Sequence, residues 1–177
     1  MQKTMVMDEA SLSRAVKRIS HEIIEKNKGC EDLCVIRIRR RGGPLAKMIC
    51  ENIKQIEGQA VPMGMLDITL YRDDVKYDVK DPIILAADIP FSVKGKKIVL
   101  VDDVLYTGRT VRAAIDAIIS LGRPSCIQLA ILVDRGHREL PIRGDYIGKN
   151  IPTSREERVY VHLPETDSEW GVFIAKK

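Results

Sequence analysis

Two adjacent aspartates stand beside a glycine turn in the stretch VLVDDVLYTGRTV, residues 99–111. Asp102 and Asp103 end a buried apolar run, and the turn 107–110 comes just before a pattern typical of a helix. Backbone amides at a helix start attract anions, and a glycine lets an anion approach closely. Carboxylates are poor partners of phosphate but good acceptors for sugar hydroxyls. The stretch therefore predicts a ligand with a phosphate and a diol, a ribose 5-phosphate.

The usual nucleotide-binding loops do not account for this stretch. The sequence contains neither the GxxxxGK[ST] phosphate loop nor the GxGxxG dinucleotide fingerprint. An isolated pair of aspartates could also be an acidic strand end that merely caps a loop. The glycine turn and the helix pattern directly after the acids favour the ligand site.

The complete stretch 99–111 resembles the phosphoribosyl pyrophosphate motif of type I phosphoribosyltransferases. Stretches at 66–74, 88–91 and 132–159 resemble the PyrR family, the bifunctional pyrimidine-operon regulators and uracil phosphoribosyltransferases. The resemblance extends over about residues 8–161. It implies an α/β type I phosphoribosyltransferase fold, with a central, mainly parallel twisted sheet flanked by helices and a small hood region.

The resemblance implies two activities. One is Mg²⁺-dependent transfer of phosphoribose from phosphoribosyl pyrophosphate to uracil, which gives UMP and pyrophosphate. The other is UMP-responsive binding of pyrimidine-operon leader RNA, which promotes transcription attenuation. Two alternatives stay open: a phosphoribosyltransferase for another base, such as a purine, and a catalytically weak nucleotide-sensing RNA-binding protein. A purine enzyme would share the motif at 99–111 but not the loop at 132–159.

The acid pair is the first candidate for catalysis. Asp102 and Asp103 are expected to hold the ribose hydroxyls or Mg²⁺, directly or through metal-bound water, and to favour a cationic, oxocarbenium-like transition state. No covalent nucleophile is needed, so catalysis would depend on positioning and charge. The residues expected to bind phosphoribosyl pyrophosphate or UMP here are Asp102, Asp103, Val104, Leu105, Tyr106, Thr107, Gly108, Arg109 and Thr110.

A second anion site is expected where the strand 33–38 ends. Arginine suits diphosphate oxygens because its planar fork forms bidentate charge-assisted hydrogen bonds, although a solvated basic strand end is the alternative. The residues that resemble the family's pyrophosphate loop are Arg41, Gly42, Leu45 and Ala46, with Arg40 beside them and Arg41 assigned as catalytic.

Two residues depart from the pyrophosphate-loop pattern. Arg40 stands where a threonine is common, which an anion site tolerates. Arg37 stands inside the strand where the resemblance leads us to expect a glycine, and a long cationic side chain there could impair the loop.

Two segments are expected to complete the substrate site. By resemblance, a flexible lid at about 71–82 covers the diphosphate, with Arg72 as a further contact or as a surface arginine. A base-recognition loop at about 134–158 is expected to contact uracil, with Arg135 and Val159 as candidates.

Basic residues gather on the first expected helix and in the 134–158 loop. Lysine and arginine on an exposed face can neutralise RNA phosphates, although such charges often only solvate a helix. The low aromatic content of 5% weakens a base-stacking platform. The residues assigned to RNA binding are Arg14, Lys17, Arg18, His21, His137, Arg138, Arg143 and Lys149.

The bulk properties predict one globular domain, residues 1–177. An apolar fraction of 45% with 31% charged residues is typical of such a domain, and the net charge of +4 alone does not predict a nucleic-acid partner. No long apolar run or signal-peptide core is present, so we expect a cytoplasmic protein without a membrane partner. The four cysteines lack metal-site spacing and are expected to be reduced. A homodimer or larger homo-oligomer is expected by resemblance.

Strands alternating with helices must position these residues. A helix is expected from Asp8, its N-cap, to about residue 27, and another from Pro44 through Ile56. A third is expected over 110–121. The expected strands are 33–38, a segment within 61–74, the IVLV run before the acids, 127–133, and two short strands near the end.

Overall fold

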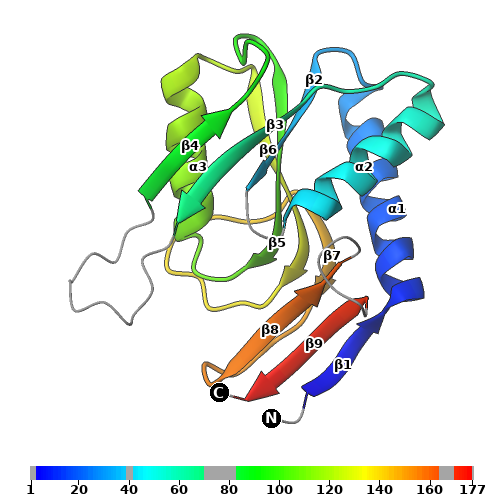
Figure 1. The fold of residues 1–177 in the computed structure, drawn as a ribbon, viewed down its shortest axis with the longest axis vertical. Helices are drawn as coiled ribbons and strands as arrows, with labels where there is room; N and C mark the ends of the chain where they lie inside the picture. The colour runs from blue at the N-terminus through cyan, green and yellow to red at the C-terminus, as the bar shows by residue number, and fades with distance from the viewer. Residues whose placement is uncertain (1–2, 39–41, 70–82, 164–169, 177) are drawn as a thin grey trace.

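Two β-sheets and three helices form the scaffold of the computed structural model, which describes residues 3–38, 42–69, 83–163 and 170–176 (Figure 1). The larger sheet has six strands and the smaller sheet has three. In spatial order the strands of the larger sheet are β4 (Ile83–Asp88), β3 (Met63–Thr69), β2 (Leu33–Ile38), β5 (Lys97–Leu105), β6 (Cys126–Asp134) and β7 (Tyr146–Asn150).

The larger sheet is mainly parallel, as predicted. Every neighbouring pair of strands in it is parallel except β3 and β4. The carboxyl ends of β2, β5 and β6 therefore lie at one edge, which faces the smaller sheet in Figure 1. In parallel α/β sheets this edge is where ligands bind.

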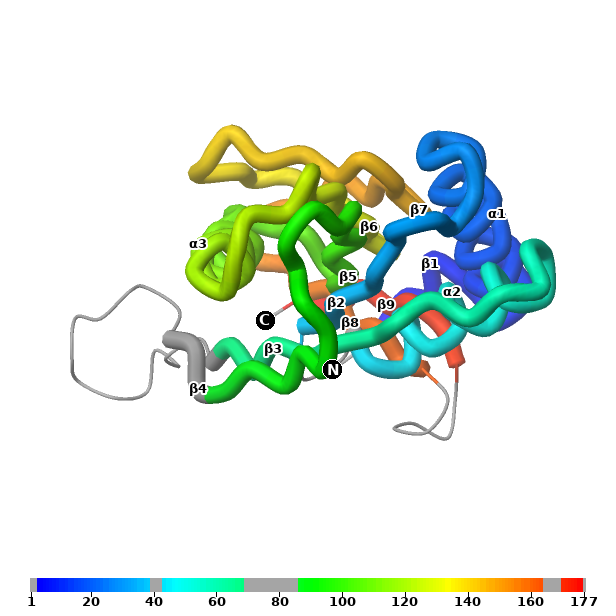
Figure 2. Tube along the Cα trace, turned by 90° about the horizontal axis from the view of Figure 1, so that it is seen from above, coloured from blue at the N-terminus to red at the C-terminus, as the bar shows by residue number. Residues whose placement is uncertain are grey.

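Helices cover both faces of the larger sheet (Figure 2). α1 (Glu9–Asn27) and α2 (Gly42–Glu57) pack on one face, whose buried core includes Val35, Val99 and Val101. α3 (Arg109–Leu121) packs on the other face. The alternation of side chains along each strand thus feeds two separate cores, which explains the nearly continuous apolar strands.

Helix α1 follows its sequence signals closely. The carboxylate of Asp8 accepts a hydrogen bond from the Ser11 amide at 2.8 Å, the N-cap expected. The buried residues of α1 include Leu12 and Ile19 of the apolar stripe. The helix ends at a left-handed residue, but that residue is Lys28 (φ 56°) rather than the glycine after it.

A buried polar cluster ties α1 to β6 and β7. The side-chain amides of Asn27 and Gln128 exchange two hydrogen bonds of 2.9 Å, and the Tyr146 hydroxyl donates to Gln128 at 2.8 Å. Burial raises the pKa of Tyr146 to about 12. Because each of these groups is satisfied, the cluster fixes how α1 sits on the sheet.

The smaller sheet is the hood, defined as β1 (Lys3–Asp8), β9 (Gly171–Lys176) and β8 (Glu157–His162) in that order. All its pairs are antiparallel, and β9 is the middle strand. Val161 and Val172 point from the hood into the core shared with α1 and α2. The hood therefore packs against the same body that carries the carboxyl edge of the larger sheet.

The structure adds strands that the sequence patterns did not predict. β1, β4 and β7 were missed, and β7 lies within the segment taken as a loop. α2 begins at Gly42 rather than at Pro44, so two glycines are its first residues. β5 runs to Leu105 and includes both aspartates. Among the described residues, no helix is long and apolar enough to cross a membrane.

Candidate active site

The acid pair lies at the carboxyl end of β5, in the middle of the larger sheet. Asp102 and Asp103 are both half-buried. An oxygen of Asp102 accepts from the Asp103 amide at 2.9 Å, and an oxygen of Asp103 accepts from the Val104 amide at 2.8 Å. These local bonds hold the two carboxylates side by side at the strand end.

The surroundings of Asp102 change its ionisation. Burial and, to a smaller extent, the charge of Asp103 raise the pKa of Asp102 well above its usual range. Two carboxylates in a partly dehydrated place repel one another, and a cation or hydroxyl donors would relieve that repulsion. The electrostatics therefore suit a ligand that brings positive charge or donors to this strand end.

The turn after β5 presents the start of α3. Gly108 is the N-cap with φ 93°, and it has no side chain with which to cap the helix. The Thr107 hydroxyl lies 3.4 Å from the Arg109 amide nitrogen, and the first turn of α3 holds no acidic residue. No acidic side chain of this turn therefore competes for the amides at the helix start, which leaves them able to bind an anion.

The residues from 104 to 110 differ in how far they are exposed. Leu105 is buried in the core, so it can meet a ligand only through its backbone, whereas Val104 and Thr110 are half-buried. Tyr106 is exposed. The Thr107 carbonyl accepts from the amides of Glu139 and Leu140, which joins this turn to the 134–158 loop.

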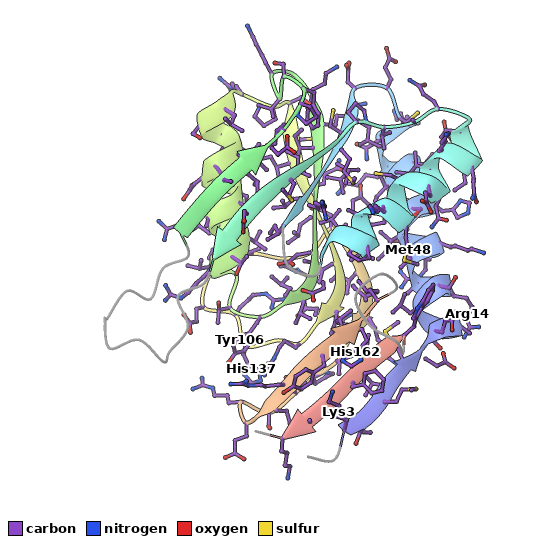
Figure 3. All side chains as sticks on the ribbon, in the orientation of Figure 1. Lys3, Arg14, Met48, Tyr106, His137 and His162 are labelled. Carbon is purple, nitrogen blue, oxygen red and sulfur yellow. The ribbon has the colours of Figure 1, made fainter. Side chains whose placement is uncertain are left out.

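Arg135 holds the 134–158 loop from inside. It is buried, and its guanidinium donates to Thr153 Oγ1 at 3.1 Å and to two backbone carbonyls at residues 154 and 157. It also lies over the Tyr106 ring, 4.1 Å from the ring centre, and His137 meets the same ring edge-on at 6.0 Å (Figure 3). The Arg135 side chain is thus occupied by its own loop, and a direct contact with the base stays a prediction.

Arg138 also has partners within the chain. Its guanidinium forms an ion pair with Asp134 and donates to the carbonyls of Tyr106 and Ile142, each at 2.8 Å. Sequence patterns gave no signal for this brace, because its partners lie on the motif and on both sides of the loop. Val159 on β8 is half-buried against the core, and its contact with the base stays a prediction.

The expected pyrophosphate site is only partly described. Arg40, Arg41 and Arg72, and the lid at about 71–82, lie outside the described residues. Gly42 is the first residue of α2, and Leu45 and Ala46 are buried in the core. The strand before this site and the helix after it are thus where the sequence placed them.

Metal ligands are few in the described part of the chain. No group of three or more histidine, cysteine, aspartate or glutamate side chains could hold a metal there. The described cysteines are free, as expected. Asp102 and Asp103 are therefore a pair of carboxylates at an open strand end rather than part of a closed cage of protein ligands.

Two of the residues assigned to RNA join α1 and β1 to β7. Arg18 on α1 donates to the Gly148 carbonyl of β7 at 2.6 Å, and Lys149 donates to the Val6 carbonyl of β1 at 2.9 Å. These bonds bring α1 and β1 beside β7, which lies within the 134–158 segment. The members whose side chains are exposed are Arg14, Lys17, Arg18, His21, Arg143 and Lys149, while His137 and Arg138 are half-buried.

Comparisons with known proteins agree with this architecture. Residues 4–165 match the family model described as the phosphoribosyl transferase domain. The chain is 64% identical over 165 residues to the "Bifunctional protein PyrR" of Acetivibrio thermocellus, with 93% of this chain and 90% of the relative covered. It is 57% identical to the protein of that name from Bacillus pumilus, with 99% of each chain covered.

A solved structure supports the fold alone. The hypoxanthine-guanine phosphoribosyltransferase of Bacillus anthracis superposes with a TM-score of 0.77 over 100% of both chains at 19% identity. With the acid pair, the uncapped helix start and the near full-length relatives in view, the chain belongs to the phosphoribosyltransferases and, among them, to the PyrR family.

Proposed function

We propose that this protein is a UMP-responsive regulator of pyrimidine-operon transcription attenuation that also converts uracil and phosphoribosyl pyrophosphate to UMP and pyrophosphate. The observation that carries the catalytic half is the pairing of two carboxylates with an uncapped helix start across the β5–α3 turn. The name of its relatives, a bifunctional protein, supports the combination of two roles.

The phosphate and the sugar have separate partners in this proposal. Amides at residues 107–110 hold the 5-phosphate, and the dipole of α3 favours its charge. Asp102 and Asp103 accept hydrogen bonds from the ribose hydroxyls. This leaves the C1 atom of the ribose above the carboxyl edge, where the base and the diphosphate can reach it from opposite sides.

The reaction then needs charge stabilisation rather than a nucleophile. The C1–O bond breaks, pyrophosphate leaves with the bonding electrons, and N1 of uracil forms the new bond to C1 and loses its proton. Positive charge develops on the sugar ring in between, and the carboxylates of Asp102 and Asp103 favour it electrostatically. The chain's own contribution is orientation of the sugar together with this field.

The acid pair fits Mg²⁺ as the metal of the substrate complex. Mg²⁺ keeps several waters and is bound by one or two carboxylates together with substrate phosphates. Two half-buried carboxylates that repel each other match that need better than a structural metal centre, which would take more protein ligands. When bound, Mg²⁺ neutralises the diphosphate charge.

Uracil selection is assigned to the 134–158 loop, with residues 1–177 acting as one domain. Arg135 holds this loop against Tyr106, so backbone groups near Gly136 have a fixed place from which to meet the base edge. Val159 supplies apolar contact from the hood. A purine-specific enzyme is the alternative, and it predicts turnover of hypoxanthine or guanine instead.

Turnover assays test the enzymatic half. Purified protein with Mg²⁺ and phosphoribosyl pyrophosphate should form UMP from labelled uracil but no product from hypoxanthine or guanine. Removal of Mg²⁺ with a chelator should abolish UMP formation. Purine turnover without uracil turnover would replace the proposal by its alternative.

The RNA half rests on the basic surface that α1 and the 134–158 loop present. Lys17, His21 and Arg143 are exposed, and no hydrogen bond or ion pair with another described residue occupies their side chains. They are therefore better probes than Arg18 or Arg138, which hold parts of the fold together. Phosphate neutralisation there would give an affinity that falls with salt.

A gel-shift titration tests this surface. The variants Lys17→Glu and Arg143→Glu should weaken binding of pyrimidine-operon leader RNA about tenfold or more in the presence of UMP, while uracil turnover persists. Arg123→Glu, an exposed arginine after α3, is the matched control and should bind as the wild type does. Unchanged RNA affinity in both test variants would remove this surface from the proposal. The proposed function also includes assembly into a homodimer or larger homo-oligomer and a cytoplasmic location.

A further inference from the structure

Arg37 and Gly43 share one space between β2 and α2. Arg37 is half-buried near the carboxyl end of β2, and its backbone pairs with Val101, two residues before Asp103. Its guanidinium reaches the first turn of α2: a Cβ atom added to Gly43 would lie 2.1 Å from Nη1 and 3.4 Å from Cζ of Arg37. The missing side chain of Gly43 is thus what leaves room for the guanidinium.

The surroundings of this guanidinium are unfavourable for a cation. The amino end of α2 carries the positive end of the helix dipole, which repels positive charge. The first turn of α2 has no acidic residue. Nor does any described residue give Arg37 a hydrogen bond or an ion pair. A half-buried charge held against a helix start without a counter-ion is costly unless an anion joins it.

We infer that Arg37 is an additional diphosphate-binding residue, and that Gly43 is the small residue that lets it reach the ligand. This inference rests on the proposed function, because it assigns the role of one more side chain in the same site. A diphosphate at the start of α2 gives the guanidinium bidentate charge-assisted partners and meets the helix dipole with the opposite charge. Gly43 thereby compensates for the large side chain of Arg37, which stands where a glycine was expected.

The diphosphate site at Arg37 can be tested separately from the 5-phosphate site, because each binds a different end of the substrate. The 5-phosphate is assigned to the turn before α3, which follows β5, whereas Arg37 stands on the neighbouring strand β2. UMP has the 5-phosphate but no diphosphate. Loss of Arg37 should therefore affect pyrophosphate and phosphoribosyl pyrophosphate while UMP binding stays as it was.

Calorimetric titrations of Arg37→Ala with three ligands test this difference. With Mg²⁺ present, the dissociation constants of pyrophosphate and phosphoribosyl pyrophosphate should rise about tenfold, as expected for the loss of a charged hydrogen-bonding partner. The dissociation constant of UMP should change less than about twofold. Arg123→Ala, an exposed arginine near the amino ends of β5 and β6, is the control and should change none of the three.

Gly43→Ala provides an independent route to the same loss. Its methyl group would take the place of the guanidinium, so this variant should weaken pyrophosphate binding even though Arg37 is still present. In the double variant, which combines Gly43→Ala with Arg37→Ala, no guanidinium occupies the space that the methyl group enters. Its pyrophosphate binding should therefore be no weaker than that of Arg37→Ala. Alanine also favours helix over glycine, so the double variant should melt no lower than Arg37→Ala.

The outcomes separate the inference from the function it rests on. A wild-type protein that forms no UMP from uracil would refute the proposed function itself. A wild-type protein that turns over uracil while Arg37→Ala binds pyrophosphate unchanged would refute only the inference. Equal weakening of UMP and pyrophosphate by Arg37→Ala would also refute it, because Arg37 would then hold the fold rather than the diphosphate.

Discussion

The β5–α3 and β2–α2 connections are the same structural unit with opposite charge. Each joins a parallel strand of the larger sheet to a helix whose first turn has no acidic residue, and a glycine lies at the start of each helix. Before α3 the strand ends in Asp102 and Asp103, whereas β2 carries Arg37 near its end. Both helix starts favour anions, so the difference lies in what the strands contribute.

This difference separates two parts of one ligand. Carboxylates beside a helix start suit a sugar phosphate, because the amides hold the phosphate and the acids hold the hydroxyls. A guanidinium beside a helix start suits a group with more negative charge and no hydroxyls. The glycines differ too: Gly108 is needed for its left-handed conformation, while Gly43 is needed for the space it leaves.

Removing one carboxylate from the β5–α3 connection should have the largest effect. Asp103→Asn keeps the shape but removes the charge that favours the cationic transition state, so kcat for UMP formation should fall about 100-fold or more. Asp116→Asn, an exposed aspartate paired with Arg112 on α3, should leave turnover unchanged. Wild-type turnover in Asp103→Asn would remove the functional contrast between the two connections.

Gly108→Ala tests whether the turn before α3 needs a left-handed residue. An alanine at φ 93° should lower the free energy of unfolding by about 1–2 kcal/mol and weaken UMP binding, because the amides would shift. Gly58→Ala is the control: Gly58 also has positive φ (70°), ends α2, and has nothing within 4 Å of an added Cβ. Both variants should lose stability in urea denaturation, but only Gly108→Ala should lose UMP affinity.

The burial of Asp102, together with the charge of Asp103 beside it, predicts a pH dependence of stability. Since the pKa of Asp102 is raised in the folded protein, the native state binds this proton more tightly than the unfolded state does. The free energy of unfolding therefore falls as pH rises from the ordinary aspartate range toward the raised pKa. Asp102→Asn should be more stable than the wild type at neutral pH, with the gap narrowing on acidification. Urea denaturation without nucleotide or Mg²⁺ measures it, and a gap that widens at low pH would contradict the cause given.

The smallest effect is expected from the ion pair that joins the α3 turn to the loop. Arg109 Nε lies 2.7 Å from Glu139 Oε2. The two side chains are 35% and 51% exposed, so water screens the pair. Glu139→Gln should cost about 0.2–1 kcal/mol of unfolding free energy, as exposed pairs do. Thermal melts would measure this, with Glu156→Gln, an exposed residue of the same loop, as the control. If Glu139→Gln lowered the unfolding free energy by several kcal/mol, the loop would stabilise this connection more than the turn does.

Local patterns predicted the parts of the fold that depend on local order. The apolar stripe of α1, its Asp8 cap and the buried strand before Asp102 are short-range signals, and the structure confirms each. The strands β1, β4 and β7 could not be found in this way. They are edge strands, and what makes them strands is a partner elsewhere in the chain.

The candidate site shows the same limit. The motif placed the acids and Gly108 correctly at a strand end and a helix start. The stacking of Arg135 on Tyr106 and the bonds of Arg138 to two separate segments arise from tertiary packing, which no spacing reveals. Arg37 was flagged only as an irregularity, because its relation to Gly43 depends on how a strand and a helix meet in space.

The middle position of β9 has a consequence for how the hood opens. Lys3 pairs with Ala175, and Ala175 pairs in turn with Arg158, so the ladders of β1 and β8 both run along this one strand. If β9 detaches, both of its neighbours lose their ladder at once. The three strands should therefore exchange their amide protons as a single cooperative unit, and residues distant in the sequence would share one opening rate.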